Sequence, residues 1–144
     1  MAVSETTDNL RQWLRSCPAL DDTNRFGVDY LTQDVTEYAL YSSPSPVKTK
    51  IDILGNVLYN NIQELNFVFA SREPYSVDVL QNLQNLGFFD EVRNWIFAQN
   101  TVKNFPDISE GEVISLLPST TQFIFEAGAD NARYQIQLKI TYRR

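Results

Sequence analysis

The clearest pattern in the chain is a strict alternation of apolar and polar residues near its C-terminal end. Charged, amide or hydroxyl side chains separate the apolar positions throughout residues 133–143. Because successive side chains of a strand point to opposite faces, this pattern predicts a strand with one buried and one exposed face. The residues predicted to face inward are Tyr134, Ile136, Leu138, Ile140 and Tyr142.

A helical period marks the beginning of the chain. Thr6 or Thr7 is the expected N-cap, and Pro18 ends the helix because proline lacks the amide hydrogen that the next turn needs. We expect the apolar face of this helix to lie on a sheet. Its members recur at i, i+3, i+4 and i+7 and are Leu10, Trp13, Leu14 and Cys17.

Residues 47–71 read as a long extended hairpin. Residues 54–56 supply a tight turn or bulge between its two arms. The second arm is either one long strand with a polar middle or two strands separated by a kink. Before the hairpin, residues 35–41 predict a strand, residues 42–46 with two prolines predict a loop, and residues 26–31 fit either.

Two helices are expected after a break at residues 73–75. Ser76 is the expected N-cap of the first, Gly87 its left-handed end, and Asp90 the start of the second. We expect the two helices to pair and to pack on the sheet. The apolar stripe of the first is Val79, Leu80, Leu83 and Leu86, and the second carries Val92, Trp95, Ile96 and Gln99 on one side.

Residues 112–117 and 121–127 predict two further strands. Helices and strands are thus segregated along the chain, which is typical of the α+β class with a mainly antiparallel sheet. A length of 144 residues favours a single domain, residues 1–144. The expected architecture is this sheet with an N-terminal helix and a central pair of helices packed on it.

Charge and cysteine content narrow the functional classes. A net charge of −6 disfavours tight binding of nucleic acid, which normally needs a basic patch. The single cysteine, Cys17, excludes an intrachain disulfide. The first eight residues show neither a basic segment nor an apolar segment of a leader, so we expect the protein to be made and kept in the cytoplasm.

The sequence predicts no catalytic residue, no cofactor and no metal site. Without histidine, most Ser-His and Cys-His arrangements and the usual zinc sites are excluded. The five glycines are scattered and form no phosphate-binding loop. The carboxylate clusters, Asp21 with Asp22 and Glu110 with Glu112, adjoin turn signals and read as solvated turns.

Tyrosine and arginine near the hairpin and the last strand can act in two ways. They can stack on bases, which the acidic composition disfavours, or contact another protein subunit. A regular last strand at a sheet edge would also need a cover or a partner. The predicted oligomer interface consists of Arg72, Glu73, Tyr75, Arg133, Tyr134 and Gln135.

Several segments, taken in order over nearly the whole chain, resemble a known family. They are WLRSCPAL at 13–20, VDYL at 28–31, FVFASREPY at 67–75, QNL at 81–83, NLGF at 85–88 and ARYQIQ at 132–137. This order resembles the minor capsid proteins of tailed phages of Gram-positive hosts, some named after chloramphenicol resistance, which are similar to tail terminators. Residues 54–56 depart from the Asp-Gly turn expected there.

The resemblance implies a structural protein of the virion. Tail terminators form a ring, commonly a hexamer, that caps the tail tube, stops its polymerisation and joins it to the neck. The implied partners are further copies of the chain, the tail tube protein, a neck or head-completion protein, and a sheath protein if the tail is contractile. DNA passes in transit only, and no membrane is involved. The implied location is the virion, with the host cytoplasm during assembly.

Three other functions stay open. A head-completion or neck connector would belong to the same structural class. An acetyltransferase, which the chloramphenicol name suggests, relies on a histidine base that this chain lacks. An assembly chaperone would leave the particle before maturation. The sequence favours a protein without enzymatic activity.

Overall fold

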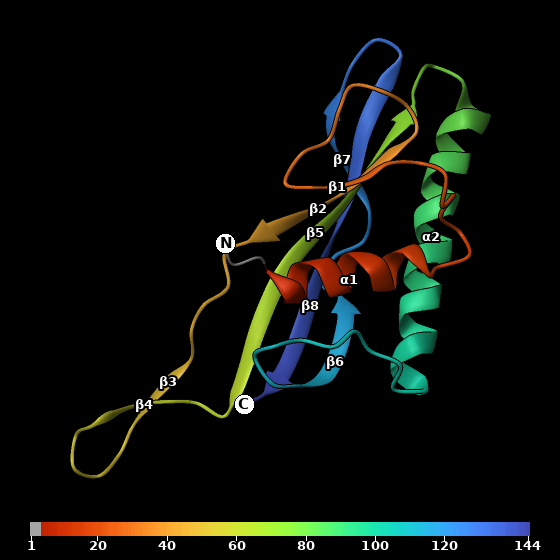
Figure 1. Ribbon diagram of the computed structural model, residues 1–144. Coiled ribbons are helices and arrows are strands. Elements are labelled where there is room, and N and C mark those ends of the chain that lie inside the picture. Colours follow the sequence, from red (N-terminus) through yellow and green to blue (C-terminus); the bar gives the residue numbers. More distant parts are fainter. Residues whose placement is uncertain (1–3) are drawn as a thin grey trace.

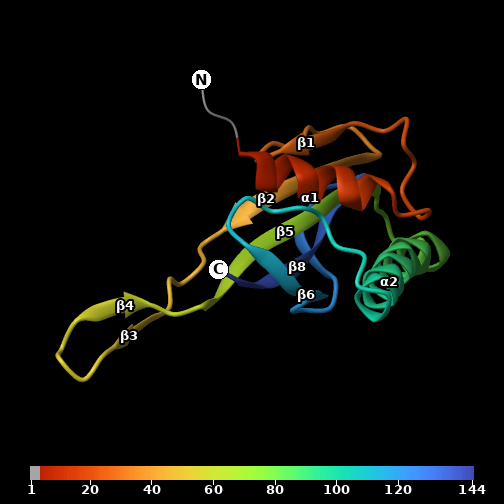
Figure 2. The same ribbon diagram turned by 60° about the horizontal axis from the view of Figure 1, so that its bottom comes forward.

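The computed structural model describes residues 4–144. The prediction about a leader rests partly on Met1 to Val3, and these residues lie outside the described part. The fold is a twisted sheet with both helices on one face and a thin hairpin projecting from one end (Figures 1 and 2). In chain order the elements are α1 (Glu5–Arg15), β1 (Phe26–Val28), β2 (Glu37–Ser43), β3 (Thr49–Ile51), β4 (Val57–Tyr59), β5 (Ile62–Pro74), α2 (Val79–Thr101), β6 (Glu112–Pro118), β7 (Phe123–Ala127) and β8 (Asn131–Arg143).

The main sheet has the strand order β1-β2-β5-β8-β6, and β7 also pairs with β8. All pairs are antiparallel except β1 with β2. The α+β class and the mainly antiparallel sheet are therefore confirmed. The last strand, however, is central: β5 lines one edge of β8 along its whole length, while β6 and β7 share the other. The expectation of an edge position was wrong, because alternation reports burial of one face and not the number of neighbours.

The core lies between the sheet and the helices, and it confirms the inward face predicted for β8. Phe67 and Phe69 of β5 point to the same side as these β8 residues, and both aromatic rings are buried. Burial of each such side chain contributes about 1.5–3 kcal/mol, so this layer is the main stabilising feature. The buried residues of β8 are Tyr134, Ile136, Leu138, Ile140 and Tyr142.

Helix α1 packs on the sheet as predicted, but it begins earlier. Ser4 is its N-cap, with the Ser4 side chain accepting a hydrogen bond from the amide of Thr7. Thr6 and Thr7 are inside the helix, and Thr6 is buried against the loop before β6, where its hydroxyl accepts from the amide of Ser109 at 3.0 Å. The ring of Trp13 lies 4.6 Å from that of Trp95, which joins the two helices.

The expected central helix pair is one continuous helix, α2, of 23 residues. Asp78 and not Ser76 is its N-cap, and its carboxylate accepts from the amide of Leu80 at 3.0 Å. Gly87 lies inside the helix. A glycine there costs about 1 kcal/mol relative to alanine. Burial of Phe89 and of further residues on the same face offsets that cost, so the helix continues through the predicted stop.

The expected long hairpin is divided between two sheets. β3 and β4 form a separate two-stranded sheet, and β5 belongs to the main sheet, so the chain follows the alternative of two strands with a kink, at residues 60 and 61. The turn is closed by Asp52, which accepts from the amides of Leu54 and Asn56, and by Gly55 at φ 84°. The hairpin proper is therefore short.

Candidate assembly surfaces

The structure separates the six residues of the predicted interface. Tyr134 is 1% exposed and lies in the core, with its ring 6.1 Å from that of Phe89. Arg72 and Gln135 are also buried, on the opposite face of the sheet. Only the other three keep exposed surface for a partner, and the interface stays a prediction that rests on them. They are Glu73, Tyr75 and Arg133.

Arg72 ties a loop to the helix-free face of the sheet. Its Nε donates to the carbonyl oxygen of Thr32 at 3.2 Å, and its guanidinium lies 3.4 Å from oxygens of Glu126 and Asn131. Glu37, opposite Arg72 on β2, is also buried and accepts from the Thr32 hydroxyl. A buried guanidinium needs such acceptors, so its first role is to hold the fold together.

Arg133 joins three strands on the same helix-free face. Its guanidinium carbon lies 4.2 Å from the ring centre of Tyr41 and 4.3 Å from that of Phe125, so it sits between two aromatic rings. Its Nε also donates to Gln135 at 3.1 Å. Each cation–π contact contributes about 0.5–1 kcal/mol at exposed sites. Phe125 remains largely exposed, so this cluster offers apolar surface beside a fixed positive charge.

Glu73 is a carboxylate held in a poorly hydrated place. It accepts from the Ser71 hydroxyl at 2.6 Å. Burial nevertheless raises the pKa of the Glu73 carboxyl, outweighing the opposite effect of hydrogen bonds from Ser71 and Thr36. Burial therefore disfavours the ionised form of Glu73 in the folded chain.

Replacing Glu73 by glutamine is expected to raise the melting temperature at pH 7 by a few degrees. Because the pKa of Glu73 is higher in the folded than in the unfolded chain, the folded chain binds the proton of this carboxyl more tightly. Protonation therefore stabilises the fold below the pKa of the unfolded chain, and this stabilisation is lost as the pH rises through the pKa of the folded chain. The gain from the amide should thus shrink between pH 7 and pH 4. Thermal unfolding at several pH values measures it, with the exposed Glu91→Gln as control. A gain that does not depend on pH would contradict this account.

A hairpin, which we call the arm (residues 47–59), projects from the sheet (Figures 1 and 2). It exposes apolar side chains to solvent. Ile53 is 97% exposed and Leu54 is 83% exposed at the tip. A two-stranded hairpin is marginally stable in water by itself, and exposed apolar groups do not help it. The other exposed apolar residues of the arm are Val47, Ile51, Val57 and Leu58.

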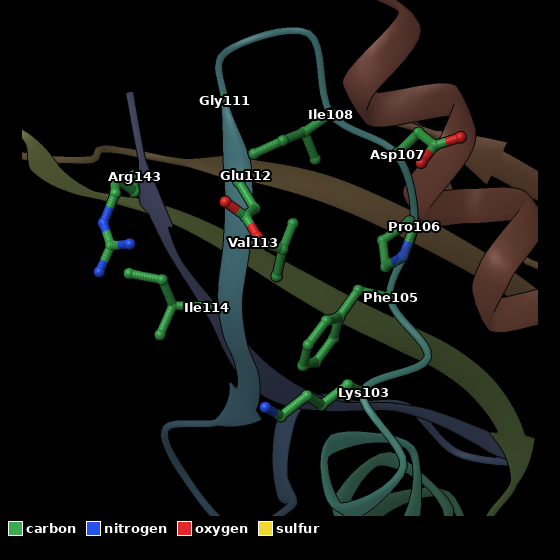
Figure 3. Close-up of a pocket in the computed structure, with 10 residues that line it drawn as sticks. All are labelled: Lys103, Phe105, Pro106, Asp107, Ile108, Gly111, Glu112, Val113, Ile114 and Arg143. Atoms are coloured by element: carbon green, nitrogen blue, oxygen red, sulfur yellow. The ribbon is translucent and has the colours of Figure 1, made fainter.

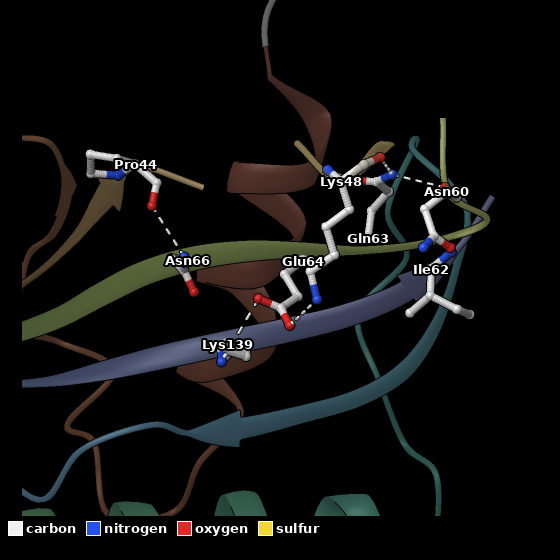
Figure 4. A network of polar contacts seen from close by, with 8 residues as sticks. All are labelled: Pro44, Lys48, Asn60, Ile62, Gln63, Glu64, Asn66 and Lys139. Carbon is white, nitrogen blue, oxygen red and sulfur yellow. Dashed lines mark hydrogen bonds and ion pairs between the residues drawn. The ribbon is translucent and has the colours of Figure 1, made fainter. Parts of the chain in front are cut away.

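The root of the arm, in contrast, is fixed by buried polar contacts (Figure 4). Gln63 is 4% exposed, and its side-chain amide bonds both backbone groups of Lys48: it accepts from the amide nitrogen at 2.9 Å and donates to the carbonyl oxygen at 2.7 Å. It also donates to the carbonyl oxygen of Asn60 at 2.8 Å. One side chain thereby replaces the missing strand pairing where the arm leaves the sheet.

An ion pair strengthens the same root. The Lys48 ammonium lies 2.7 Å from one carboxylate oxygen of Glu64, and Lys139 of β8 lies 3.8 Å from the other (Figure 4). The hydrogen bond from Lys48 lowers the pKa of the Glu64 carboxyl, so the pair persists at neutral pH. Lys48, the residue before β3, is therefore tied to β5 directly and to β8 through Glu64.

Gln63→Ala is expected to release the arm while leaving the sheet folded. Three hydrogen bonds are lost, and we expect a cost of about 1–3 kcal/mol, because the backbone groups of Lys48 and Asn60 can be rehydrated near the surface. Hydrogen exchange of the amides in residues 49–59 should become faster than in the wild type. Gln137→Ala, an exposed amide on β8, is the matched control. Unchanged exchange in the arm would show that Gln63 does not fix it.

A second apolar surface runs along α2. The residues of α2 that face the sheet are spaced at helical intervals from Asn85 to Ile96. The stripe expected to pack on the sheet instead lies on the opposite side and is exposed, Val79 at 70% and Leu83 at 58%. The helix is thus apolar on both sides, which is typical of a helix covered on both sides. We call this exposed set the α2 row, and its members are Val79, Leu80, Leu83 and Leu86.

A hollow lies between the loop after α2 and the start of β6 (Figure 3). Its volume is about 610 Å³, and it is open to solvent. Its lining includes apolar side chains, among them Phe105, Ile108 and Val113. It also includes charged residues of both signs, which are Lys103, Asp107, Glu112 and Arg143. An open hollow of mixed lining suits contact with a side chain of another protein more than enclosure of a small substrate.

Across residues 4–144, no group of three His, Cys, Asp or Glu side chains is placed to hold a metal ion. Neither α1 nor α2 combines the length and the apolarity that crossing a bilayer requires. In comparisons with known proteins, the chain matches neither a family model nor a curated protein sequence.

Proposed function

We propose that this chain is a structural protein of a phage virion without enzymatic activity, which acts as a tail terminator. In this role, copies of the chain form a ring that caps the tail tube and stops its polymerisation. The ring joins the tube to a neck protein, and DNA passes through its channel. The protein is then found in the virion, and in the host cytoplasm during assembly.

The observation that carries the proposal is that a well-packed fold keeps two apolar surfaces exposed, one on the arm and one on α2. The arm and the α2 row both expose side chains that a monomer has no reason to keep apolar. The ordered resemblance of the segments from 13–20 to 132–137 supports the phage role. The net charge of −6 is compatible with a channel that lets DNA pass without holding it.

Electron microscopy of particles made without this protein tests the proposal. In the phage that carries the gene, disabling the gene should yield overlong or ragged tails that are not joined to heads. Normal tails beside leaking heads would favour the alternative, a head-completion or neck connector. Normal, infectious particles would overturn both.

A further inference from the structure

The arm and the α2 row are complementary in chemistry. The arm places a small set of branched aliphatic side chains at its tip, and the row presents aliphatic side chains spaced over two turns of helix. A narrow hairpin tip laid along a helix buries apolar groups of both without desolvating charges. Within one chain they cannot meet, because the arm and α2 lie on opposite sides of the molecule in both views (Figures 1 and 2).

The charges of the two surfaces are also opposite. Residues 78–101 carry three carboxylates against one guanidinium, a net charge of −2, whereas residues 47–59 carry two lysines against one aspartate, a net charge of +1. Asp90 lies on the exposed side of α2, where hydrogen bonds from Gln122 and Arg93 hold it and lower the pKa of its carboxyl. Lys50 is exposed on the arm. Lys48 and Asp90 already have partners within the chain. The exposed Lys50 on the arm and the net negative charge of α2 still favour contact between an arm and an α2 row over contact between two α2 rows.

The sheet edges are a poorer place for the arm to dock. β1 has three residues and offers a short edge. On β6 the middle of the edge is already used, because Asn100 of α2 bonds both backbone groups of Leu116. A hairpin that added to β6 as a strand would have to displace this side chain. The α2 row needs no such displacement.

We propose that the arm of one copy docks on the α2 row of a neighbouring copy. The proposal rests on the proposed function only in that the chain must associate with itself. Because the two surfaces differ and lie on opposite sides, the contact is heterologous and each copy can bind two neighbours, which generates a ring where the rotation closes. The polar clamp of Gln63 at the root fixes the direction in which the arm reaches its neighbour.

Complementation between two variants tests this arrangement. The arm variant carries Ile53→Ser with Leu54→Ser, and the helix variant carries Leu80→Gln with Leu83→Gln; all four side chains are exposed, so both variants should fold. The wild type should self-associate with rising concentration, and each variant alone should stay monomeric. An equimolar mixture should form a 1:1 dimer, because the arm variant keeps its row and the helix variant keeps its arm. Light scattering after size exclusion measures the mass, which should double.

The control is Val28→Ser on β1, which removes an exposed apolar side chain elsewhere and should associate like the wild type. The proposal is overturned if the wild type stays monomeric up to its solubility limit, if either variant still self-associates, or if the mixture stays monomeric. These outcomes are separate from the tail phenotype. Ragged tails together with failed complementation would support the terminator role and overturn the contact between arm and α2 row. Successful complementation together with normal particles would support the contact and overturn the terminator role.

Discussion

Tyr134→Ala is expected to lower the free energy of unfolding by about 3–5 kcal/mol, the range found when a buried aromatic side chain is removed. The ring is 1% exposed and packs at the centre of the core, between the sheet and Phe89 of α2. Deleting it leaves a cavity that the flanking strands cannot fill, since β8 is paired on both edges. The loss is comparable with the whole stability of a small domain.

Chemical denaturation monitored by circular dichroism measures this change. Tyr134→Phe is the control, because it keeps the ring and should cost far less. Tyr75→Ala provides the contrast: that side chain is half-buried, so its removal should affect stability less. If Tyr134→Ala kept wild-type stability but failed to assemble, the side chain would belong to an interface, as the sequence suggested, and not to the core.

Asn100→Leu is expected to cost about 2–4 kcal/mol, because two backbone groups next to the core lose their partners. The Asn100 side chain accepts from the amide of Leu116 at 2.9 Å and donates to the carbonyl oxygen of the same residue. It also donates to the carbonyl oxygen of Ile96. The amide thereby acts as a strand partner for β6 and fastens the end of α2 to the sheet. Leucine has a similar volume, so the loss reports hydrogen bonding more than packing.

Denaturation together with hydrogen exchange at the Leu116 amide measures the effect. Asn94→Leu, an exposed position on the same helix, is the matched control and should change stability little. The Leu116 amide should exchange faster in Asn100→Leu and not in Asn94→Leu. Equal stability of the two variants would show that water satisfies the edge of β6 equally well.

Local periodicity was sufficient to predict the buried face of those elements that contact the core on one side and water on the other. The alternation of β8 and the helical stripe of α1 each identify the buried face, because one face of each element meets water and the other meets the core. The α+β class followed from the order of these elements. The two N-caps lie at Ser4 and Asp78, a few residues from the predicted positions, since several neighbouring side chains can cap a helix.

For α2 the sequence pattern was ambiguous. Apolar residues occur on all sides of this helix, so the stripe beginning at Val79 looked as suitable for the sheet as the one that includes Phe89. Gly87 then suggested a stop that long-range packing overrides. The choice between the two sides depends on which residues reach the sheet. In the folded chain Phe89 is buried there, and Asn85 donates a hydrogen bond to the carbonyl oxygen of Pro74.

The fold and the candidate surfaces depend partly on local sequence and partly on tertiary contacts. The sequence by itself determined the fold class, the buried face of β8 and the lack of histidine chemistry, because these depend on residue type and on spacing over a few positions. Only the tertiary structure decided that Arg72 and Gln135 are buried, that the stripe at Val79 faces water and that Gln63 holds the root of the arm. These properties depend on contacts between segments far apart in the chain, and such contacts leave no periodic signal in either segment.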